Sequence, residues 1–330
     1  MADATPQVSV VVRSYNRYPA LCELLTAILA QRDADFEVVV VDQTTKAPDD
    51  ARARLAALAA DPRVRILTFP PLGGPRARNE GVRAARGEIV LLIDDDDLPG
   101  DDRWIASHAA NYVDPNCVAV NGRAIVEGDR DPPYGNMARA ERNVMSLSWL
   151  GWQRPYSKVN VKKRVHSVVG GNASIRRSAI ARAGLWDECT PVEDEVSFAY
   201  RLRARMRPDE YILFDPACTM QRRLDIPGGM GKRYLGTTTV ARRHFQFLHR
   251  IVGHYFPWKY WLLQPAYVFL LYWITADWVI DDSHGHPGGL RKAWTLVWFA
   301  LALPLLWTWW LGAEVVRRVR SGPLQHEPRL

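Results

Sequence analysis

Short apolar runs alternate with segments of helical periodicity over residues 8–99. Four runs rich in β-branched residues predict buried strands at 8–12, 36–42, 64–69 and 88–94. The intervening segments repeat their apolar positions at helical spacing and predict helices over 19–31, 48–60 and 76–85. This order predicts an α/β fold with a Rossmann-like, mostly parallel sheet and helices on both of its faces.

The pattern is looser between residues 103 and 216. Further strands are predicted at 117–125 and 211–214. Residues 127–166 are polar and contain prolines, and we interpret them as an inserted loop.

The composition shifts towards long apolar segments after Gly231. Residues 293–316 are long enough to cross a hydrocarbon core about 30 Å thick, and their one charge, Glu314, lies near one end. Residues 262–280 are a weaker candidate because polar residues and a proline interrupt them. They could span the membrane, re-enter it or lie in the interface, and spanning is favoured.

Basic residues flank these apolar segments. The formal net charge is +7 and the pI is about 9.3, which indicates an anionic partner. Lysines and arginines concentrate before the first apolar segment and after the second, so the positive-inside rule places both flanks in the cytoplasm. We expect a cytoplasm-facing α/β domain over 1–225, a basic amphipathic juxtamembrane segment over 226–260, and a membrane anchor with two candidate transmembrane helices over 261–330.

Several familiar chemistries lack their sequence signatures. The four cysteines are scattered without a C-x-x-C pair, which favours a reducing compartment over a zinc site or a disulfide framework. The stretch LGGPRARNEG is neither G-x-G-x-x-G nor a P-loop, and there is no G-x-S-x-G or H-E-x-x-H motif. Hydride transfer, ATP hydrolysis and serine hydrolysis are therefore disfavoured.

Four consecutive aspartates, Asp94 to Asp97, follow the fourth predicted strand in LLIDDDDLPG. Neighbouring carboxylates repel one another, and a bound cation would offset that repulsion. Mg²⁺ and Mn²⁺ prefer carboxylate oxygens, and ligands of α/β sheets bind beyond the carboxyl ends of the strands. The alternative is a solvated acidic turn.

Five stretches together resemble the family 2 glycosyltransferases of the GT-A fold, in a membrane-anchored bacterial form. The resemblance covers about two thirds of the chain. The stretches are VSVVVRSYNR (8–17), VVVVDQTT (38–45), GGPRARNEGVRAARGEIVLLIDDDD (73–97), GGNASIRRSAIARAGLWDE (170–188) and EDEVSFAYRL (193–202).

The resemblance implies a site for a nucleotide-diphosphate sugar and a divalent cation, Mn²⁺ or Mg²⁺. Asp96 would bind the metal, and Asp94 would hold the ribose or complete the metal shell. The further donor-binding residues that it implies are Ser14, Tyr15, Asn16, Arg17, Asp42, Arg76, Arg78, Asn79, Asp95, Gly171 and Asn172. Asp42 could instead cap a turn, and the arginines could mark a solvated helix start.

The resemblance also assigns the acceptor side of the reaction. Asp194 would remove the proton of an acceptor hydroxyl, and Glu193 would contact the acceptor. Both acids could instead simply open a helix, where negative charge is favoured.

The sequence departs from the family pattern in three places. Gln43 and its two following threonines replace the usual acidic residue and Gly-Ser, which leaves the base open. Arg13 stands where proline is frequent, and Gln221 falls near a common histidine that helps to hold the metal or the diphosphate.

The sequence thus predicts an inverting, metal-dependent hexosyltransferase at the cytoplasmic membrane. Its partners would be a nucleotide-diphosphate sugar, a lipid-linked or polyprenyl-linked acceptor hydroxyl and membrane lipids, and not nucleic acid. Two alternatives remain open: a polyprenyl-phosphate glycosyltransferase, and a catalytically silent nucleotide-sugar-binding subunit of a polysaccharide assembly complex. The sequence also leaves open whether the protein forms a homo-oligomer.

Overall fold

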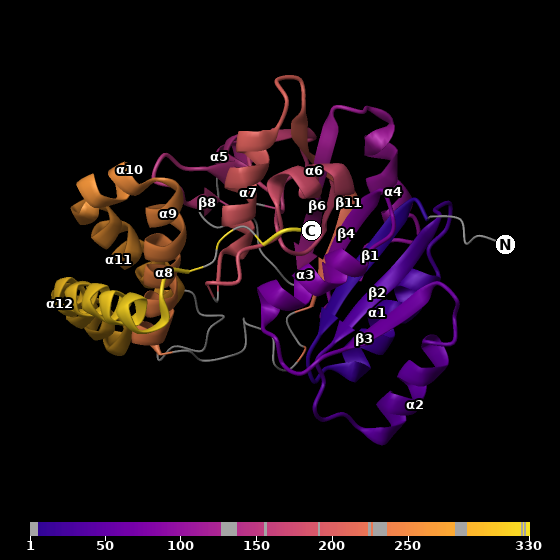
Figure 1. The fold of residues 1–330 in the computed structure, drawn as a ribbon, viewed down its shortest axis with the longest axis horizontal. Helices are drawn as coiled ribbons and strands as arrows, with labels where there is room; N and C mark the ends of the chain where they lie inside the picture. Colours follow the sequence, from indigo (N-terminus) through magenta and orange to yellow (C-terminus); the bar gives the residue numbers. More distant parts are fainter. Residues whose placement is uncertain are drawn as a thin grey trace. The chain divides into compact units, whose positions relative to one another are not determined.

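The chain divides into two compact units in a computed structural model (Figure 1). One unit comprises Met1–Trp186, Phe198–Ile226 and Glu327–Leu330, and the other comprises Asp187–Ser197 and Pro227–His326. The structure describes residues 6–126, 137–154, 157–190, 192–223, 226, 236–280, 289–324, 326 and 328–330. The expected boundary at 225/226 and residues 227–235 of the expected juxtamembrane segment lie outside these residues, whereas 236–260 are described.

The first unit is built on a mixed sheet with the strand order β3-β2-β1-β4-β10-β6-β11-β5, and β9 pairs with β11. Its first four strands are all parallel. They are β1 (Val8–Ser14), β2 (Phe36–Asp42), β3 (Val64–Thr68) and β4 (Ile89–Asp94). The remaining strands are β5 (Asp97–Pro99), β6 (Cys117–Val126), β9 (Lys163–Val165), β10 (Ala173–Arg176) and β11 (Tyr211–Arg222).

Two apolar clusters cover the two faces of this sheet. Val8, Val10 and Val12 of β1 point into one cluster, which also includes residues of α1, α2 and α4. Val11 points into the other, with residues of α3, α6 and α7. These helices are α1 (Tyr18–Leu29), α2 (Asp49–Leu58), α3 (Gly74–Ala84), α4 (Trp104–Ala110), α6 (Arg177–Ala183) and α7 (Asp194–Arg205). The predicted α/β fold is confirmed.

Two local predictions were wrong. The described part of 127–166 is not simply a loop, because it contains α5 (Met137–Asn143), β9 and the hairpin of β7 (Ser146–Leu147) and β8 (Gln153–Arg154); residues 127–136 and 155–156 lie outside the description. Buried Val144 and Met145 anchor this segment in the core. Strand β11 continues past the predicted end at Phe214, and its register with β6 shifts between Asp215 and Thr219, around Pro216, which has no N–H to donate.

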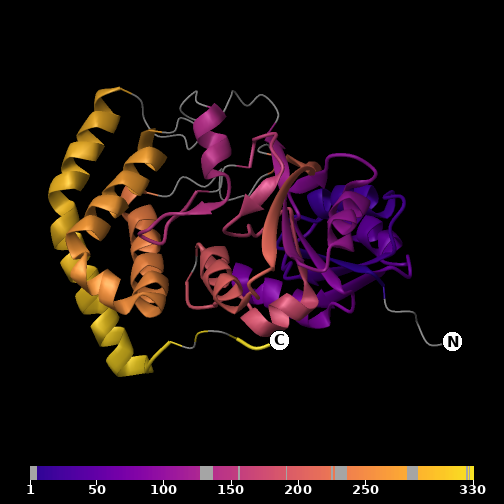
Figure 2. The ribbon, with the colours of Figure 1, turned by 90° about the horizontal axis from the view of Figure 1, so that it is seen from above.

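The second unit is helical. Its elements are α8 (Thr237–Phe247), a π-helical turn (Leu248–Val252), α9 (Gly253–Tyr255), α10 (Pro257–Leu262), α11 (Gln264–Ile280) and α12 (Leu290–Ser321). Helices α11 and α12 lie side by side in Figures 1 and 2. Aromatic rings join α12 to α8, where Phe245 meets Trp307 edge to face with 4.9 Å between the ring centroids.

Among the described residues, α12 is the one helix that is long and apolar enough to cross a membrane. Most of its surface is exposed, including Leu301 and Leu305, which are 76% and 77% exposed. The other candidate, 262–280, does not meet this criterion, because α11 has only 17 residues and α10 ends just before it.

Candidate active site

Four consecutive aspartates turn the chain from β4 into β5. Asp94 ends β4 and Asp97 begins β5, so Asp95 and Asp96 form the tight turn between the two strands. Carboxylate oxygens of Asp94, Asp96 and Asp97 lie within 4.8 Å of one another. This donor set and its spacing fit a divalent cation such as Mg²⁺ or Mn²⁺.

Two arginines from the end of β1 and the turn after it pair with three of these carboxylates. Arg13 Nε lies 2.9 Å from Asp94 Oδ1. Arg17 Nη2 lies 2.8 Å from Asp95 Oδ1, and its Nη1 donates to Asp96 Oδ2. A single guanidinium therefore bridges two neighbouring aspartates and offsets part of their repulsion.

The fourth aspartate, Asp97 of β5, pairs with an arginine of the neighbouring strand β11. Arg222 ends β11, and its Nη2 lies 3.5 Å from Asp97 Oδ2. Burial raises the pKa of Asp97 to about 7, although Arg222 opposes this shift. A divalent cation would stabilise the charged carboxylate and lower this pKa.

Burial and neighbouring charge act in opposite directions on Asp94 and Asp95. Burial disfavours charge on Asp94, but the guanidinium groups of Arg13 and Arg78 outweigh it and lower the pKa of that carboxyl. Burial raises the pKa of Asp95 to about 7 despite the opposing effect of Arg17. The ionised form is therefore favoured more strongly at Asp94 than at its neighbour Asp95.

The turn after β1 is tied to the loop after β2. Asn16 adopts a left-handed conformation with a φ of 55°. Its backbone N–H donates to Thr44 Oγ1 at 3.0 Å, and its side-chain oxygen accepts the backbone N–H groups of Thr45 at 2.8 Å and Lys46 at 3.1 Å. Tyr15 is 41% exposed, so its ring is available to a ligand at this edge.

Asp42, at the end of β2, is buried and already hydrogen-bonded. Its Oδ1 accepts the backbone N–H of Thr44 at 2.9 Å, and its Oδ2 accepts the Tyr18 hydroxyl at 2.5 Å. The turn-capping interaction is therefore present, and it leaves the carboxylate fixed beside the end of β1. There Ser14 donates its hydroxyl to Asp95 at 2.7 Å.

The three predicted residues on α3 have different surroundings. Arg76 is exposed, whereas Arg78 is buried with its guanidinium carbon 5.5 Å from the centroid of the Trp186 ring. Asn79 donates to the Trp186 carbonyl at 2.8 Å and accepts the Trp186 N–H at 3.0 Å. Both ends of its amide thus hold the chain after α6, which fits a structural role better than donor binding.

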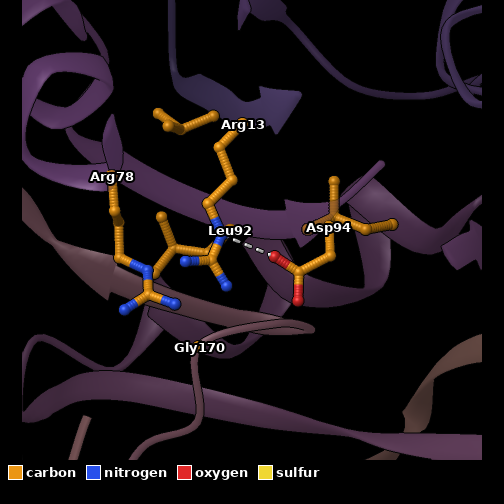
Figure 3. Close-up of a pocket in the computed structure, with 7 residues that line it drawn as sticks. Arg13, Arg78, Leu92, Asp94 and Gly170 are labelled. Atoms are coloured by element: carbon orange, nitrogen blue, oxygen red, sulfur yellow. Dashed lines mark hydrogen bonds and ion pairs between the residues drawn. The ribbon is translucent and has the colours of Figure 1, made fainter. Parts of the chain in front are cut away.

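A small pocket lies between the arginines and Asp94. It is lined by Val11, Arg13, Arg78, Leu92, Ile93, Asp94 and Gly170. In Figure 3 the Arg13 and Arg78 side chains extend into the same space, and Arg13 reaches the Asp94 carboxylate. Two guanidinium groups on one side of this space favour an anionic ligand group there.

The glycine-rich turn before β10 lies close to Asp94. A Cβ atom on Gly171 would lie 3.3 Å from Asp94 Oδ2, so this glycine leaves little room for a larger residue. Asn172 has a different environment, because its Oδ1 accepts the Trp104 indole N–H at 2.8 Å and lies 3.1 Å from His108 Nε2. Buried Asn172 therefore holds the core together and does not line the pocket.

Glu193 and Asp194 belong to the second unit, at the start of α7. Glu193 has a φ of 61°, and Asp194 is 5% exposed. Burial raises the pKa of Glu193 to about 8, and the nearby Glu195 and Asp194 add to the shift. Burial thus favours the protonated form of Glu193, which can donate a hydrogen bond. A general base must be ionised, so Glu193 does not fit that role.

Sequence reasoning missed two contributors to the acidic site and left a third without a role. Asp97 adjoins Asp96 but has no assigned role in the sequence prediction, and Arg222 is far from these aspartates in the sequence. Arg13, which departs from the family pattern, pairs with Asp94 in the structure. The structure also places the other two departures from the family pattern. Gln43 accepts the Leu72 N–H at 2.7 Å, and Gln221 lies on β11 opposite Leu98 of β5.

The fold and this site define an α/β protein with an acidic centre at the carboxyl ends of parallel strands, where such folds bind ligands. Residues 9–184 match the model of Glycosyl transferase family 2, and the chain belongs to this family. The resemblance found in the sequence is thereby confirmed.

Relatives of this chain include proteins named for glycan synthesis. It is 39% identical over 223 residues to the succinoglycan biosynthesis protein ExoO of Rhizobium meliloti (strain 1021), across 61% of this chain and 62% of that protein. It is 36% identical over 92 residues to the uncharacterized glycosyltransferase YwdF of Bacillus subtilis (strain 168), across 28% of this chain and 33% of that protein. The match therefore spans less than two thirds of either relative.

Solved structures share the GT-A fold. The mannosyltransferase PcManGT from Pyrobaculum calidifontis, in complex with GDP-Man and Mn²⁺, aligns with a TM-score of 0.55 and 21% identity over 96% of this chain and 88% of its own. S. aureus TarS in complex with UDP aligns with a TM-score of 0.51 and 16% identity over 75% of this chain and 64% of its own.

Proposed function

We propose that the protein is a metal-dependent, inverting glycosyltransferase that moves a hexose from a nucleotide-diphosphate sugar to a hydroxyl of a lipid-linked acceptor at the cytoplasmic face of the membrane. The observation that carries this proposal is the cluster of Asp94, Asp96 and Asp97 at the end of a parallel strand, beside basic side chains. Family membership and the named ligands of the two structural neighbours support it.

The carboxylates of Asp94, Asp96 and Asp97 would hold Mn²⁺ or Mg²⁺. When bound, such a cation supplies Lewis-acid stabilisation to a departing diphosphate. Arg13 and Arg78 add positive charge at the pocket where the same anion would lie.

The edge formed by the ends of β1 and β2 would hold the nucleoside. Tyr15 offers an exposed ring, and Asp42 offers a carboxylate that two hydrogen bonds fix in place. Ser14 and Asn16 would shape this edge through their bonds to the neighbouring turn and loop. These residues bind and orient the donor; they take no proton in the reaction.

Asp194 would act as the general base on the acceptor hydroxyl, while protonated Glu193 donates a hydrogen bond to the acceptor. The alternative polyprenyl-phosphate transferase would need no base, because its acceptor is already ionised. A catalytically silent binding subunit would bind nucleotide sugar without consuming it.

Thermal unfolding with UDP, GDP and dTDP sugars in the presence of Mn²⁺ tests donor binding. The proposal expects one nucleotide series to raise the unfolding temperature, since ligand that binds only the folded state stabilises it. It also expects slow release of the free sugar from that donor. No stabilisation by any series would contradict the proposal, and binding without cleavage or transfer would favour the silent subunit.

Helix α12 would anchor the protein in the membrane. Replacing both Leu301 and Leu305 by arginine is expected to move the full chain from the membrane fraction to the soluble fraction, because each central arginine costs about 2.5–3.5 kcal/mol on insertion. Fractionation after an alkaline wash measures this. Arginine at Val113, which is 88% exposed in the other unit, is the matched control and should leave membrane association unchanged. Retention of the double variant in the washed membranes would contradict the anchor.

A further inference from the structure

One arginine of the helical unit contacts both the long apolar helix and the segment that leads to Asp194. Arg250 lies in the π-helical turn between α8 and α9. Its Nη2 and Nε donate to Glu314 Oε1 of α12 at 2.6 and 3.2 Å, and its Nη1 donates to the Cys189 carbonyl at 2.7 Å. A planar guanidinium can serve both partners at once, and an ammonium group cannot reproduce that fork.

The ion pair is buried. The Arg250 side chain is 14% exposed and the Glu314 side chain is 7% exposed. The second oxygen of Glu314 accepts Arg317 Nε at 2.7 Å, so both oxygens of this carboxylate are paired. A buried, fully paired carboxylate has one strongly preferred geometry, and it fixes the direction of the Arg250 guanidinium.

The same segment is held at a second point. The Tyr255 hydroxyl donates to Asp187 Oδ2 at 3.1 Å, and His326 Nδ1 lies 3.6 Å from Asp187 Oδ1. The His326 ring stacks on His254 with 3.8 Å between the centroids. Asp187 and Cys189 are thus both tied to the C-terminal helices, and the chain enters Glu193 and Asp194 a few residues later.

We propose that Arg250 is a positioning residue, which transmits the position of the anchor helix α12 to Asp194 through the Cys189 carbonyl. The segment Asp187–Ser197 clusters with the C-terminal helices and not with the sheet. The residue proposed to meet the acceptor therefore belongs to the same unit as α12, the proposed membrane anchor. This inference rests on the proposed role of Asp194 as the base.

The test uses the full chain in detergent or nanodiscs and begins with Arg250→Lys. Lysine keeps a positive charge for Glu314 but cannot also hold the Cys189 carbonyl in the same geometry. We expect kcat to fall by about 10- to 100-fold, since a misplacement of about 1 Å can cost about 10² in rate. The donor KM and the nucleotide-induced rise in unfolding temperature should stay unchanged. Arg318→Lys, on the exposed surface of α12, is the matched control and should behave as wild type.

A double-mutant cycle with Asp194→Asn separates positioning from a general loss of stability. If Arg250 acts through Asp194, Arg250→Lys should cost less than about twofold once Asp194 is already replaced. Equal losses in the two backgrounds, or a normal kcat in the single variant, would overturn the inference while leaving the proposed function intact.

A charge swap distinguishes the Cys189 contact from the ion pair. Arg250→Glu and Arg317→Glu combined with Glu314→Arg reverse all three charges and should restore the unfolding temperature but not kcat, because a carboxylate cannot donate to the Cys189 carbonyl. Recovery of both would show that the ion pair acts only on stability and would overturn the inference. Absence of sugar transfer by the wild-type chain itself would instead reject the proposed function.

Discussion

Replacing Asp96 by alanine is expected to lower sugar transfer by about 10³-fold or more and to weaken Mn²⁺ binding. Asp96 is one of three aspartates whose oxygens lie within 4.8 Å of one another. Loss of one ligand removes part of a stabilisation that is worth several kcal/mol at a departing diphosphate, and each 1.36 kcal/mol changes the rate about tenfold. Initial transfer rates measure the first effect, and electron paramagnetic resonance of Mn²⁺ measures the second.

This substitution should leave the chain folded. The Asp96 side chain is 21% exposed, and its loss relieves the repulsion between neighbouring carboxylates. Asp102→Ala removes a more exposed aspartate, paired with Arg32 at the surface, and serves as the matched control. Wild-type turnover by Asp96→Ala in the presence of excess EDTA would contradict the proposed metal site.

Replacing Asp194 by asparagine is expected to lower transfer to a hydroxyl acceptor by about 10² to 10⁴-fold, the usual contribution of a positioned general base. The amide keeps the size of the side chain and can still accept a hydrogen bond at the start of α7. Donor affinity should therefore stay nearly constant, and the loss should be in kcat. Steady-state kinetics with the donor and the acceptor varied separately measure both quantities.

The outcome also separates the two acceptor chemistries. A near-normal rate for Asp194→Asn would reject the hydroxyl acceptor and favour polyprenyl phosphate, which has no proton to lose. A loss of donor binding together with transfer would assign Asp194 a structural role at the start of α7. Asp209→Asn, at an exposed aspartate in the turn after α7, is the matched control.

The N-terminal half of the sheet was predictable because its signals are local. Strand β2 matches its predicted range, and the strands at 64–69 and 88–94 differ from β3 and β4 by one residue at one end. Buried parallel strands are continuous β-branched runs, and each of these runs is bounded by turn residues. The position of the aspartates at a strand end followed from the same pattern.

The rest depends on contacts that are distant in the sequence. Nothing near Asp97 in the sequence indicates that Arg222 will pair with it, because β5 and β11 are far apart along the chain and meet only in the folded sheet. Asn79 fits a donor-binding motif, yet the backbone of Trp186 uses both ends of its amide. Likewise, the sequence of residues 187–197 gives no sign that this segment packs with the C-terminal helices.

The proposed reaction transfers a sugar from a nucleotide-diphosphate donor with inversion at the anomeric carbon. Proton NMR of the full chain with Mn²⁺, the stabilising nucleotide sugar and a lipid-linked acceptor follows the donor and the product in one experiment. We expect nucleoside diphosphate and glycoside to form in equal amounts, and the anomeric configuration of the new bond to be opposite to that of the donor. A product that retains the donor's configuration, or a donor that binds and is never consumed, would contradict the proposed reaction.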